Sequence, residues 1–283
     1  MNAEANAIPG AESRFADVGG IRTHYIEAGA GTPIVLVHGG GSGADAFGNW
    51  RSCIPLFARH FRVFAVDMVG FGKSAKPDPA GFTYSQQNRN KHLTGFVEGL
   101  GLGPVGLVGN SMGGATALGV AMERPDLVAN LVLMGSAGIK TADPPSPALK
   151  AIVDYDFTVD GMRRLIAALT GPGYRPDDAM VRYRHALSVE PATKAALQAT
   201  NAIVKQGGLF YDDERVAQVK TRTLVVNGKL DQISTLTRAA KFLSLLENSW
   251  GYIIPHCGHW VMIEAPEDFS AAVASFFRAG PAP

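Results

Sequence analysis

The stretch Val105-Gly106-Leu107-Val108-Gly109-Asn110-Ser111-Met112-Gly113-Gly114 decides how this chain folds. An apolar run ends in the pattern Gly-x-Ser-x-Gly, and small residues with helical character follow from Ala115 to Met122. A strand that turns this sharply into a helix holds its serine at a strained backbone position with the hydroxyl exposed. The start of the helix then offers unpaired N–H groups to developing negative charge. We interpret Ser111 as a nucleophile, and a Gly-Ser turn without chemistry is the alternative.

The composition indicates a globular chain without a nucleic-acid or membrane partner. Of 283 residues, 46% are hydrophobic and 18% are charged, and the net charge is +1 with the basic residues scattered. This balance does not predict a nucleic-acid groove or an anionic membrane partner. No apolar stretch is long enough to span a bilayer, and residues 1–12 lack the basic start and apolar core of a signal peptide. Two cysteines, Cys53 and Cys257, make no disulfide framework, so we expect a cytoplasmic protein with reduced thiols.

Short apolar runs bounded by Gly, Pro or Asp alternate with helical patterns, as in a parallel sheet. The expected strands are residues 14–18, 23–27, 33–37, 61–66, 105–108, 131–134, 223–226 and 251–254, of which the first two form an antiparallel pair. The expected helices around them are residues 50–59, 85–100, 114–124, 236–246 and 266–277. Repeated strand-helix units predict an α/β fold with a mostly parallel eight-stranded sheet and helices on both faces.

This alternation of strand and helix breaks between Gly138 and Gly208. A Pro-rich stretch, residues 143–147, leads into helical patterns at 159–169, 177–187 and 192–206, with no strand pattern among them. An all-helical insertion between two sheet strands is best interpreted as a cap over the active site. We therefore expect an α/β core in two parts, residues 1–138 and 211–283, and a helical cap at residues 139–210.

The acid that would support Ser111 is expected after a later strand. The run from Thr223 ends in Asp231, at the right place in the chain order. Asp231 could instead only cap a helix that begins near Ser234. Asp212 and Asp213 lie before the strand and are weaker candidates.

The base is expected after the last strand, where the chain reads Pro255-His256-Cys257-Gly258-His259-Trp260. We favour His259 because Gly258 suits the tight turn before it, and His256 is the rival base or a packed loop histidine. The order Ser111, Asp231, His259 predicts a catalytic triad. The imidazole takes the serine proton, while the carboxylate fixes its tautomer and stabilises the imidazolium.

A glycine-rich loop, Val37-His38-Gly39-Gly40-Gly41-Ser42-Gly43, follows an expected strand. Such a loop can turn a backbone N–H toward an oxyanion, and the amide of Met112 would be the second donor. The alternatives are a flexible loop and a phosphate-binding loop. The second is weak, because no Lys-Ser/Thr pair follows the glycines at P-loop spacing. We expect His38 to be a structural histidine bonded to the loop backbone.

Taken together, the motifs resemble those of the α/β-hydrolase superfamily, and in particular the meta-cleavage product hydrolases, which break carbon–carbon bonds in bacterial aromatic degradation. The likeness covers nearly the whole chain. It is carried by His38-Gly39-Gly40-Gly41 with Gly48-Asn49-Trp50-Arg51, Asp67-Met68-Val69-Gly70-Phe71-Gly72-Lys73, Gly109-Asn110-Ser111-Met112-Gly113-Gly114-Ala115, Gly207-Gly208-Leu209-Phe210-Tyr211, and Ile254-Pro255-His256-Cys257-Gly258-His259-Trp260.

The resemblance implies roles for the matching positions. The triad would be Ser111, Asp231 and His259, and the amides of Gly40 and Met112 would form the oxyanion hole. The dienoate end of a substrate would be held by Asn49, Asn110, Arg184, Trp260 and Gly41. Arg182 lies two residues from Arg184 and could take its place, or both arginines could simply be solvated.

The resemblance also implies the reaction. The substrate would be a 2-hydroxy-6-oxohexa-2,4-dienoate with a group on C6, cleaved between C5 and C6 to 2-hydroxypenta-2,4-dienoate and a carboxylic acid. The family needs no metal and no organic cofactor, and its members are commonly homodimers or larger homo-oligomers. A carboxylesterase and, less favoured, a small-molecule receptor of the same fold are the alternatives. The identity of the C6 group stays open at the level of sequence.

Overall fold

The computed structural model describes residues 8–144 and 146–279. Its core is one eight-stranded sheet with the strand order β1-β2-β4-β3-β5-β6-β7-β8. Its strands are β1 (Ala11–Val18), β2 (Ile21–Ala28), β3 (Pro33–Val37), β4 (Arg62–Val66), β5 (Val105–Asn110), β6 (Val128–Met134), β7 (Thr223–Gly228) and β8 (Ser249–Ile254). β2 pairs antiparallel with β1 and with β4, and all other neighbours are parallel. The predicted α/β fold with a mostly parallel sheet is confirmed.

The register of the parallel strands brings their carboxyl ends to one edge of the sheet. Val37 of β3 lies opposite Gly109 of β5, and Asn110 of β5 lies opposite Met134 of β6. Gly228 of β7 lies opposite Ile254 of β8. The loops that follow these strands therefore meet at this edge, where ligands bind in open parallel sheets.

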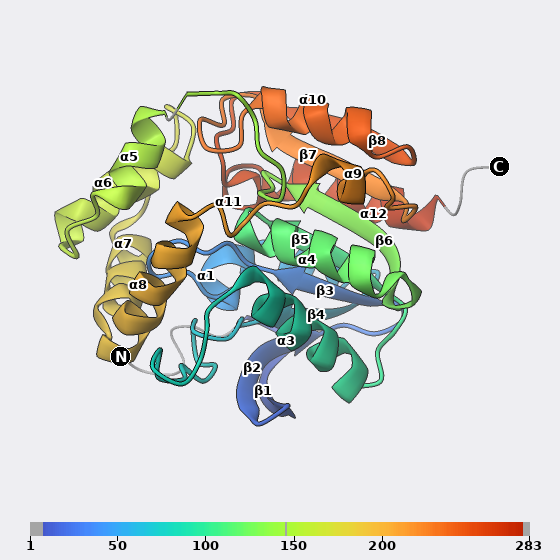
Figure 1. Cartoon of the computed structure of the whole chain (residues 1–283), viewed down its shortest axis with the longest axis horizontal. Helices are drawn as coiled ribbons and strands as arrows, with labels where there is room; N and C mark the ends of the chain where they lie inside the picture. Colours follow the sequence, from blue (N-terminus) through green and yellow to red (C-terminus); the bar gives the residue numbers. More distant parts are fainter. Residues whose placement is uncertain (1–7, 145, 280–283) are drawn as a thin grey trace.

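Helices cover both faces of the sheet. They are α1 (Ala46–Trp50), α2 (Ile54–Phe57), α3 (Gln86–Gly99), α4 (Met112–Glu123), α9 (Asp213–Val216), α10 (Leu236–Leu245), α11 (Val261–Glu264) and α12 (Pro266–Arg278), with a 3-10 turn at Pro125–Leu127. The central strands are apolar on both faces because side chains alternate across a strand. In β3, Leu36 packs with the cluster under α2 and α12, and Val35 packs with the cluster under α3 and α4, which Figure 1 shows in front of the sheet.

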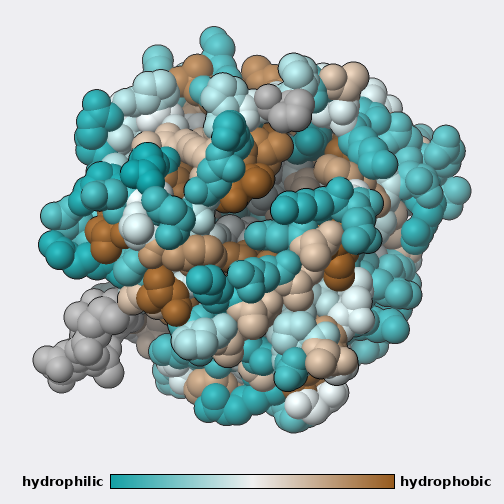
Figure 2. Space-filling view, turned by 60° about the vertical axis from the view of Figure 1, so that its left-hand side comes forward, coloured by the Kyte–Doolittle hydropathy of each residue, from teal (hydrophilic) through white to brown (hydrophobic). Residues whose placement is uncertain are grey.

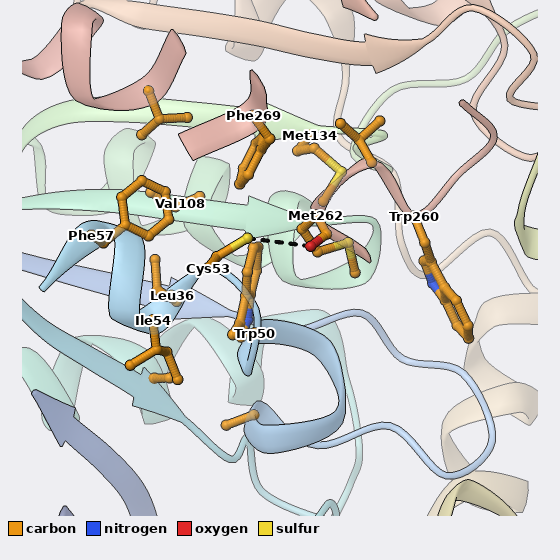
Figure 3. Packing of buried hydrophobic residues seen from close by; sticks show 14 of the residues in the cluster. Leu36, Trp50, Cys53, Ile54, Phe57, Val108, Met134, Trp260, Met262 and Phe269 are labelled. Atoms are coloured by element: carbon orange, nitrogen blue, oxygen red, sulfur yellow. Dashed lines mark hydrogen bonds between the residues drawn. The ribbon is translucent and has the colours of Figure 1, made fainter. Parts of the chain in front are cut away.

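The cluster beneath α12 is built from aromatic rings against strand residues. The rings of Trp50 and Phe269 stack with their centroids 6.1 Å apart. The thiol of Cys53 lies beside them and donates to the carbonyl of Met262 at 3.3 Å, as Figure 3 shows. Both cysteines are buried free thiols, and burial raises the pKa of Cys53 to about 12. This thiol is therefore a packed, neutral group.

One predicted helix is wrong in its extent. Residues 50–59 were expected as a single helix, but the chain forms α1 and α2 with a turn between them. Pro55 lies in the first turn of α2. Proline has no N–H and disfavours helical geometry at the residue before it, so it starts a helix far better than it continues one.

Between β6 and the short helix α9 that precedes β7 lie four helices, one more than the sequence predicted there. They are α5 (Pro147–Val153), α6 (Val159–Leu169), α7 (Asp178–Val189) and α8 (Pro191–Lys205). The missed helix, α5, begins inside the Pro-rich stretch, where Ser146 accepts a hydrogen bond from the amide of Leu149 at 3.1 Å. A capping serine followed by proline at the first helical position is a helix start as much as a loop signal. Helices α5–α8 lie together at the left of Figure 1.

Within the residues that the structure describes, no helix has the length and apolar character required to cross a membrane.

Candidate active site

Ser111 lies at the turn between β5 and α4 and has φ 54° and ψ −117°. A left-handed backbone at a residue with a side chain is strained, and such strain is typical of a nucleophile elbow. Glycine is required on both sides of the turn. A Cβ at Gly109 would lie 2.5 Å from the carbonyl oxygen of Gly113, and one at Gly113 would lie 2.4 Å from the carbonyl oxygen of Val37.

His259 and Asp231 form a buried pair beside this turn. The Nδ1 atom of His259 lies 2.8 Å from Oδ2 of Asp231, and both side chains are almost fully buried. The other carboxylate oxygen, Oδ1, accepts from the amides of Ile233 at 2.7 Å and Ser234 at 2.9 Å. Asp231 thus does both things that the sequence allowed: one oxygen caps the following turn, and the other faces the imidazole. With the proton on Nδ1, Nε2 of His259 is left to accept one.

The rival histidine lies elsewhere. His256 is exposed, has φ 64° and does not line the cavity that contains Ser111 and His259. The structure therefore brings His259, and not His256, to the candidate nucleophile.

The glycine-rich loop after β3 lies directly against the elbow. A Cβ at Gly39 would lie 3.4 Å from Cβ of Ser111, and one at Gly40 would lie 2.5 Å from the sulfur of Met112. His38 holds the loop: its Nδ1 donates to the carbonyl of Gly39 at 2.7 Å, and its Nε2 accepts from the amide of Met68 at 3.1 Å. Burial lowers the pKa of His38, which keeps the ring neutral. The structural role expected for His38 is confirmed.

Arg184 of α7 is a buried cation at the same site. It is 1% exposed, its Nη1 donates to Oδ1 of Asn49 at 3.2 Å, and its guanidinium lies 4.3 Å from the ring centre of Trp260. Burial lowers its pKa to about 10, so the side chain stays charged at neutral pH. Among the described residues it forms no salt bridge, and its Nε has no hydrogen-bond partner. A buried cation without a salt bridge destabilises the fold unless a bound anion pairs with it.

The neighbouring Arg182 is placed differently. Its side chain is 73% exposed and lies 3.6 Å from Asp178 on the outer surface of α7. Arg184, not Arg182, therefore faces the site.

A cavity of about 400 Å³ joins these groups. It lies between the carboxyl ends of the strands and helices α5–α8, and Trp260 points toward it, away from the packed cluster of Figure 3. Polar groups in its wall are Ser111, His259, Asn49, Asn110, Arg184, Thr200, Asn201, Lys205 and Arg238. The apolar part of the wall comprises Leu149, Ile152, Val153, Leu165, Leu169, Val204, Leu209, Phe210 and Ile233. Figure 2 shows this side of the molecule, where hydrophobic residues border a hollow.

Asn110 at the end of β5 has an oxygen available to a ligand. Its Nδ2 donates to the carbonyl of Met134 at 3.2 Å, while its Oδ1 is buried without a hydrogen-bond partner among the described residues. No three His, Cys, Asp or Glu side chains in the described part of the chain are grouped closely enough to hold a metal ion.

A second buried carboxylate, Asp45, ties the core to α7 next to Arg184. Its Oδ1 accepts from the amide of Gly48 at 2.6 Å, and its Oδ2 accepts from the hydroxyl of Tyr183. Burial, with the nearby charge of Asp67, raises the pKa of Asp45 to about 6. Asp45 was not predicted from the sequence, because no motif distinguishes a buried capping aspartate from an exposed one.

The raised pKa of Asp45 predicts a specific effect of pH on stability. The folded protein holds this proton up to about pH 6, and the unfolded chain releases it near 3.8. The contribution of Asp45 to the stability of the wild type should therefore fall as the pH rises through this window. The side chain in Asp45→Asn cannot ionise. The free energy of unfolding of this variant, relative to that of the wild type, should therefore increase by up to about 3 kcal/mol between pH 4 and pH 7.

Urea unfolding across this pH range measures that difference. Asp160→Asn, at an exposed position of α6, is the control and should not reproduce the trend. A difference between Asp45→Asn and wild type that stays constant with pH would contradict the assignment.

The fold and the site together define an α/β hydrolase with a serine nucleophile position. Residues 32–266 match the family model for the alpha/beta hydrolase fold. The chain is 51% identical over 265 residues to the 2-hydroxy-6-oxo-6-(2'-aminophenyl)hexa-2,4-dienoic acid hydrolase of Metapseudomonas resinovorans, with 93% of this chain and 90% of the relative covered. It is 34% identical to the 2-hydroxy-6-oxo-2,4-heptadienoate hydrolase of Pseudomonas putida, covering 94% and 96% of the two chains.

Solved structures agree with these relatives. A serine hydrolase involved in carbazole degradation superposes with a TM-score of 0.87 at 50% identity, and 95% of this chain and 99% of that chain are covered. The chain therefore belongs to the α/β-hydrolase family and, within it, to the carbon–carbon bond hydrolases of meta-cleavage products.

Proposed function

We propose that this enzyme cleaves the C5–C6 bond of 2-hydroxy-6-oxo-6-arylhexa-2,4-dienoates, giving 2-hydroxypenta-2,4-dienoate and an aromatic carboxylic acid, in bacterial degradation of aromatic compounds. The observation that carries the proposal is the buried Arg184 cation, without a salt bridge to any described residue, in the same cavity as Ser111 and His259. The nearby carboxylate of Asp45 bonds to Gly48 and Tyr183 and forms no salt bridge with Arg184. A substrate carboxylate would supply a directly bound anion, and a neutral ester would not.

The polar wall supports a position for the dienoate end of the substrate. Arg184 binds the C1 carboxylate, because a guanidinium fork matches a carboxylate. Asn49 and Trp260 hold the arginine in place, and the Asn110 amide and the Gly41 backbone contact the dienol. The apolar wall then accommodates the group on C6.

The reaction proceeds in two stages. The dienol first ketonises, taking a proton at C5 with the help of His259, so that the electrons of the C5–C6 bond can leave into an enolate. Ser111 then attacks the C6 carbonyl while His259 takes its proton, and the amides of Gly40 and Met112 stabilise the oxyanion. Cleavage releases 2-hydroxypenta-2,4-dienoate, and water hydrolyses the acyl-enzyme.

The organisation of the chain follows from this chemistry. We propose that residues 139–210 act as a cap that closes the cavity over the core formed by 1–138 and 211–283.

We further propose that the enzyme works in the cytoplasm as a homodimer or larger homo-oligomer. Its two free thiols suit a reducing compartment, and Trp250, Tyr252 and Ile253 expose apolar surface on the edge strand β8.

The test of the carboxylate site is Arg184→Ala. A hydrogen bond to a charged group contributes roughly 1.5–3 kcal/mol, so kcat/KM for an aryl dienoate should fall by about one to two powers of ten. Both kcat and KM should change, because ketonisation needs the dienoate in register. Hydrolysis of a small neutral aryl ester should be nearly unchanged.

Arg182→Ala is the matched control and should be mild on both substrates. If Arg182→Ala shows the dienoate-specific loss instead, the carboxylate site is assigned to the wrong arginine. Wild-type enzyme that hydrolyses esters efficiently and leaves dienoates intact would identify a carboxylesterase. Tight binding without turnover of either substrate would identify a receptor.

A further inference from the structure

Thr200 of α8 is a buried polar group that the proposed chemistry leaves unused. It lines the cavity and is 2% exposed. Its hydroxyl has no hydrogen-bond partner among the described residues. A buried hydroxyl without a partner is destabilising, so the site contains an unmet polar contact.

Other buried threonines in or directly after the described helices have a partner for the hydroxyl group, and Thr193 of α8 donates to the carboxylate of Glu190. Thr116 of α4 donates to the carbonyl of Met112 at 3.0 Å, and the Thr170 hydroxyl donates to the carbonyl of Ile166 at 3.0 Å. This bond to the residue four positions earlier is the usual solution for a threonine in a helix. The hydroxyl of Thr200 forms no such bond to a described residue. Its O–H donor and its acceptor oxygen can therefore both bond to a molecule in the cavity.

The substrate itself limits what that partner can be. In the proposed reaction the C1 carboxylate binds Arg184, and the C6 oxygen binds the backbone amides of Gly40 and Met112. The remaining, variable part of the substrate is the group on C6. Leu149, Ile152, Val153 and Val204 line the cavity together with Thr200 and suit the carbon atoms of a ring. Asn201 and Lys205 line it as well but form no hydrogen bond with Thr200, so a polar substituent on that ring is the partner that remains.

We infer that Thr200 determines specificity for the C6 group, its hydroxyl forming a hydrogen bond with an amino or hydroxyl substituent on the C6 aryl ring. The inference rests on the proposed function for the orientation of the substrate. An amino group donates to Oγ1 of Thr200, and a ring hydroxyl can donate or accept. A bare phenyl ring leaves the Thr200 hydroxyl unpaired.

Neutral aryl methyl ketones test this without turnover. Acetophenone and its 2'-, 3'- and 4'-amino derivatives carry the ring and carbonyl but no carboxylate. Calorimetry with wild type and Thr200→Val, which keeps the shape of the side chain without the hydroxyl, should show a three- to tenfold loss of affinity, about that of one hydrogen bond, for at least one amino isomer. Affinity for acetophenone should be equal or higher in the variant.

Two variants separate recognition from structure. Thr200→Ser keeps the hydroxyl and should restore the preference for the amino ketone. Thr170→Val, at a buried threonine whose hydroxyl is already bonded, should leave the preference unchanged. Loss of the same size for all four ketones in Thr200→Val, or no loss for any, overturns the inference.

Cleavage rates of two dienoates test the role of Thr200 separately from the proposed function. With 6-phenyl and 6-aminophenyl dienoates, Thr200→Val should lower kcat/KM for the amino substrate alone, by the same three- to tenfold. Cleavage of both dienoates by wild type with no selective change in the variant overturns the role of Thr200 and leaves the proposed function standing. Failure of wild type to cleave either dienoate overturns the proposed function, and the ketone affinities still decide the role of Thr200.

Discussion

Ser111→Ala should abolish release of the carboxylic acid, lowering kcat by about four to six powers of ten, because removal of a triad nucleophile leaves only the catalysis due to binding and the oxyanion hole. Binding should survive, since the proposed contacts to the dienoate come from Arg184, Asn49 and Trp260 and not from the serine. Steady-state assay of acid release, with spectroscopic titration of the coloured dienolate, measures both quantities.

The control for this variant is Ser270→Ala. Ser270 is a buried serine of α12 that does not line the cavity. Its replacement should leave kcat close to that of wild type. Undiminished acid release by Ser111→Ala would place the nucleophile elsewhere.

The second large effect is expected from Asp231→Asn, with kcat lower by about four powers of ten. An asparagine that turns its NH₂ toward Nδ1 of His259 would force the ring proton onto Nε2, where it blocks acceptance of the serine proton. The fold should persist, because the asparagine oxygen can still accept from the amides of Ile233 and Ser234.

Kinetics together with thermal unfolding separate these two functions of Asp231. The melting temperature should remain near that of wild type while kcat collapses. Asp143→Asn, which removes a carboxylate bonded to the Thr235 hydroxyl in a nearby loop, is the control and should keep its activity. Turnover at the wild-type rate in Asp231→Asn would reduce Asp231 to a cap of its turn.

Local sequence signals were sufficient for most of the sheet and for the elbow. Each buried strand is a short apolar run between turn residues, and β5 is buried at every position. The Gly-x-Ser-x-Gly turn could be predicted because glycine is required where Gly109 and Gly113 meet other backbone atoms. The predictions were wrong where two local signals compete. The helix expected at 50–59 is reduced to α2, with Pro55 in its first turn, and Pro147 begins α5 where no helix was expected.

Sequence by itself determined the fold class, the order Ser111, Asp231, His259 and the family, because these depend on periodicity and on motifs within a few residues. Only the tertiary structure separated Arg184 from Arg182. Two residues along a helix point to nearly opposite sides, and Arg184 acquires its surroundings from Asn49, 135 positions away in sequence. Only the tertiary structure showed, in addition, that the hydroxyl of Thr200 has no partner among the described residues. The partner of a buried polar group is set by contacts between distant segments, which local pattern does not encode.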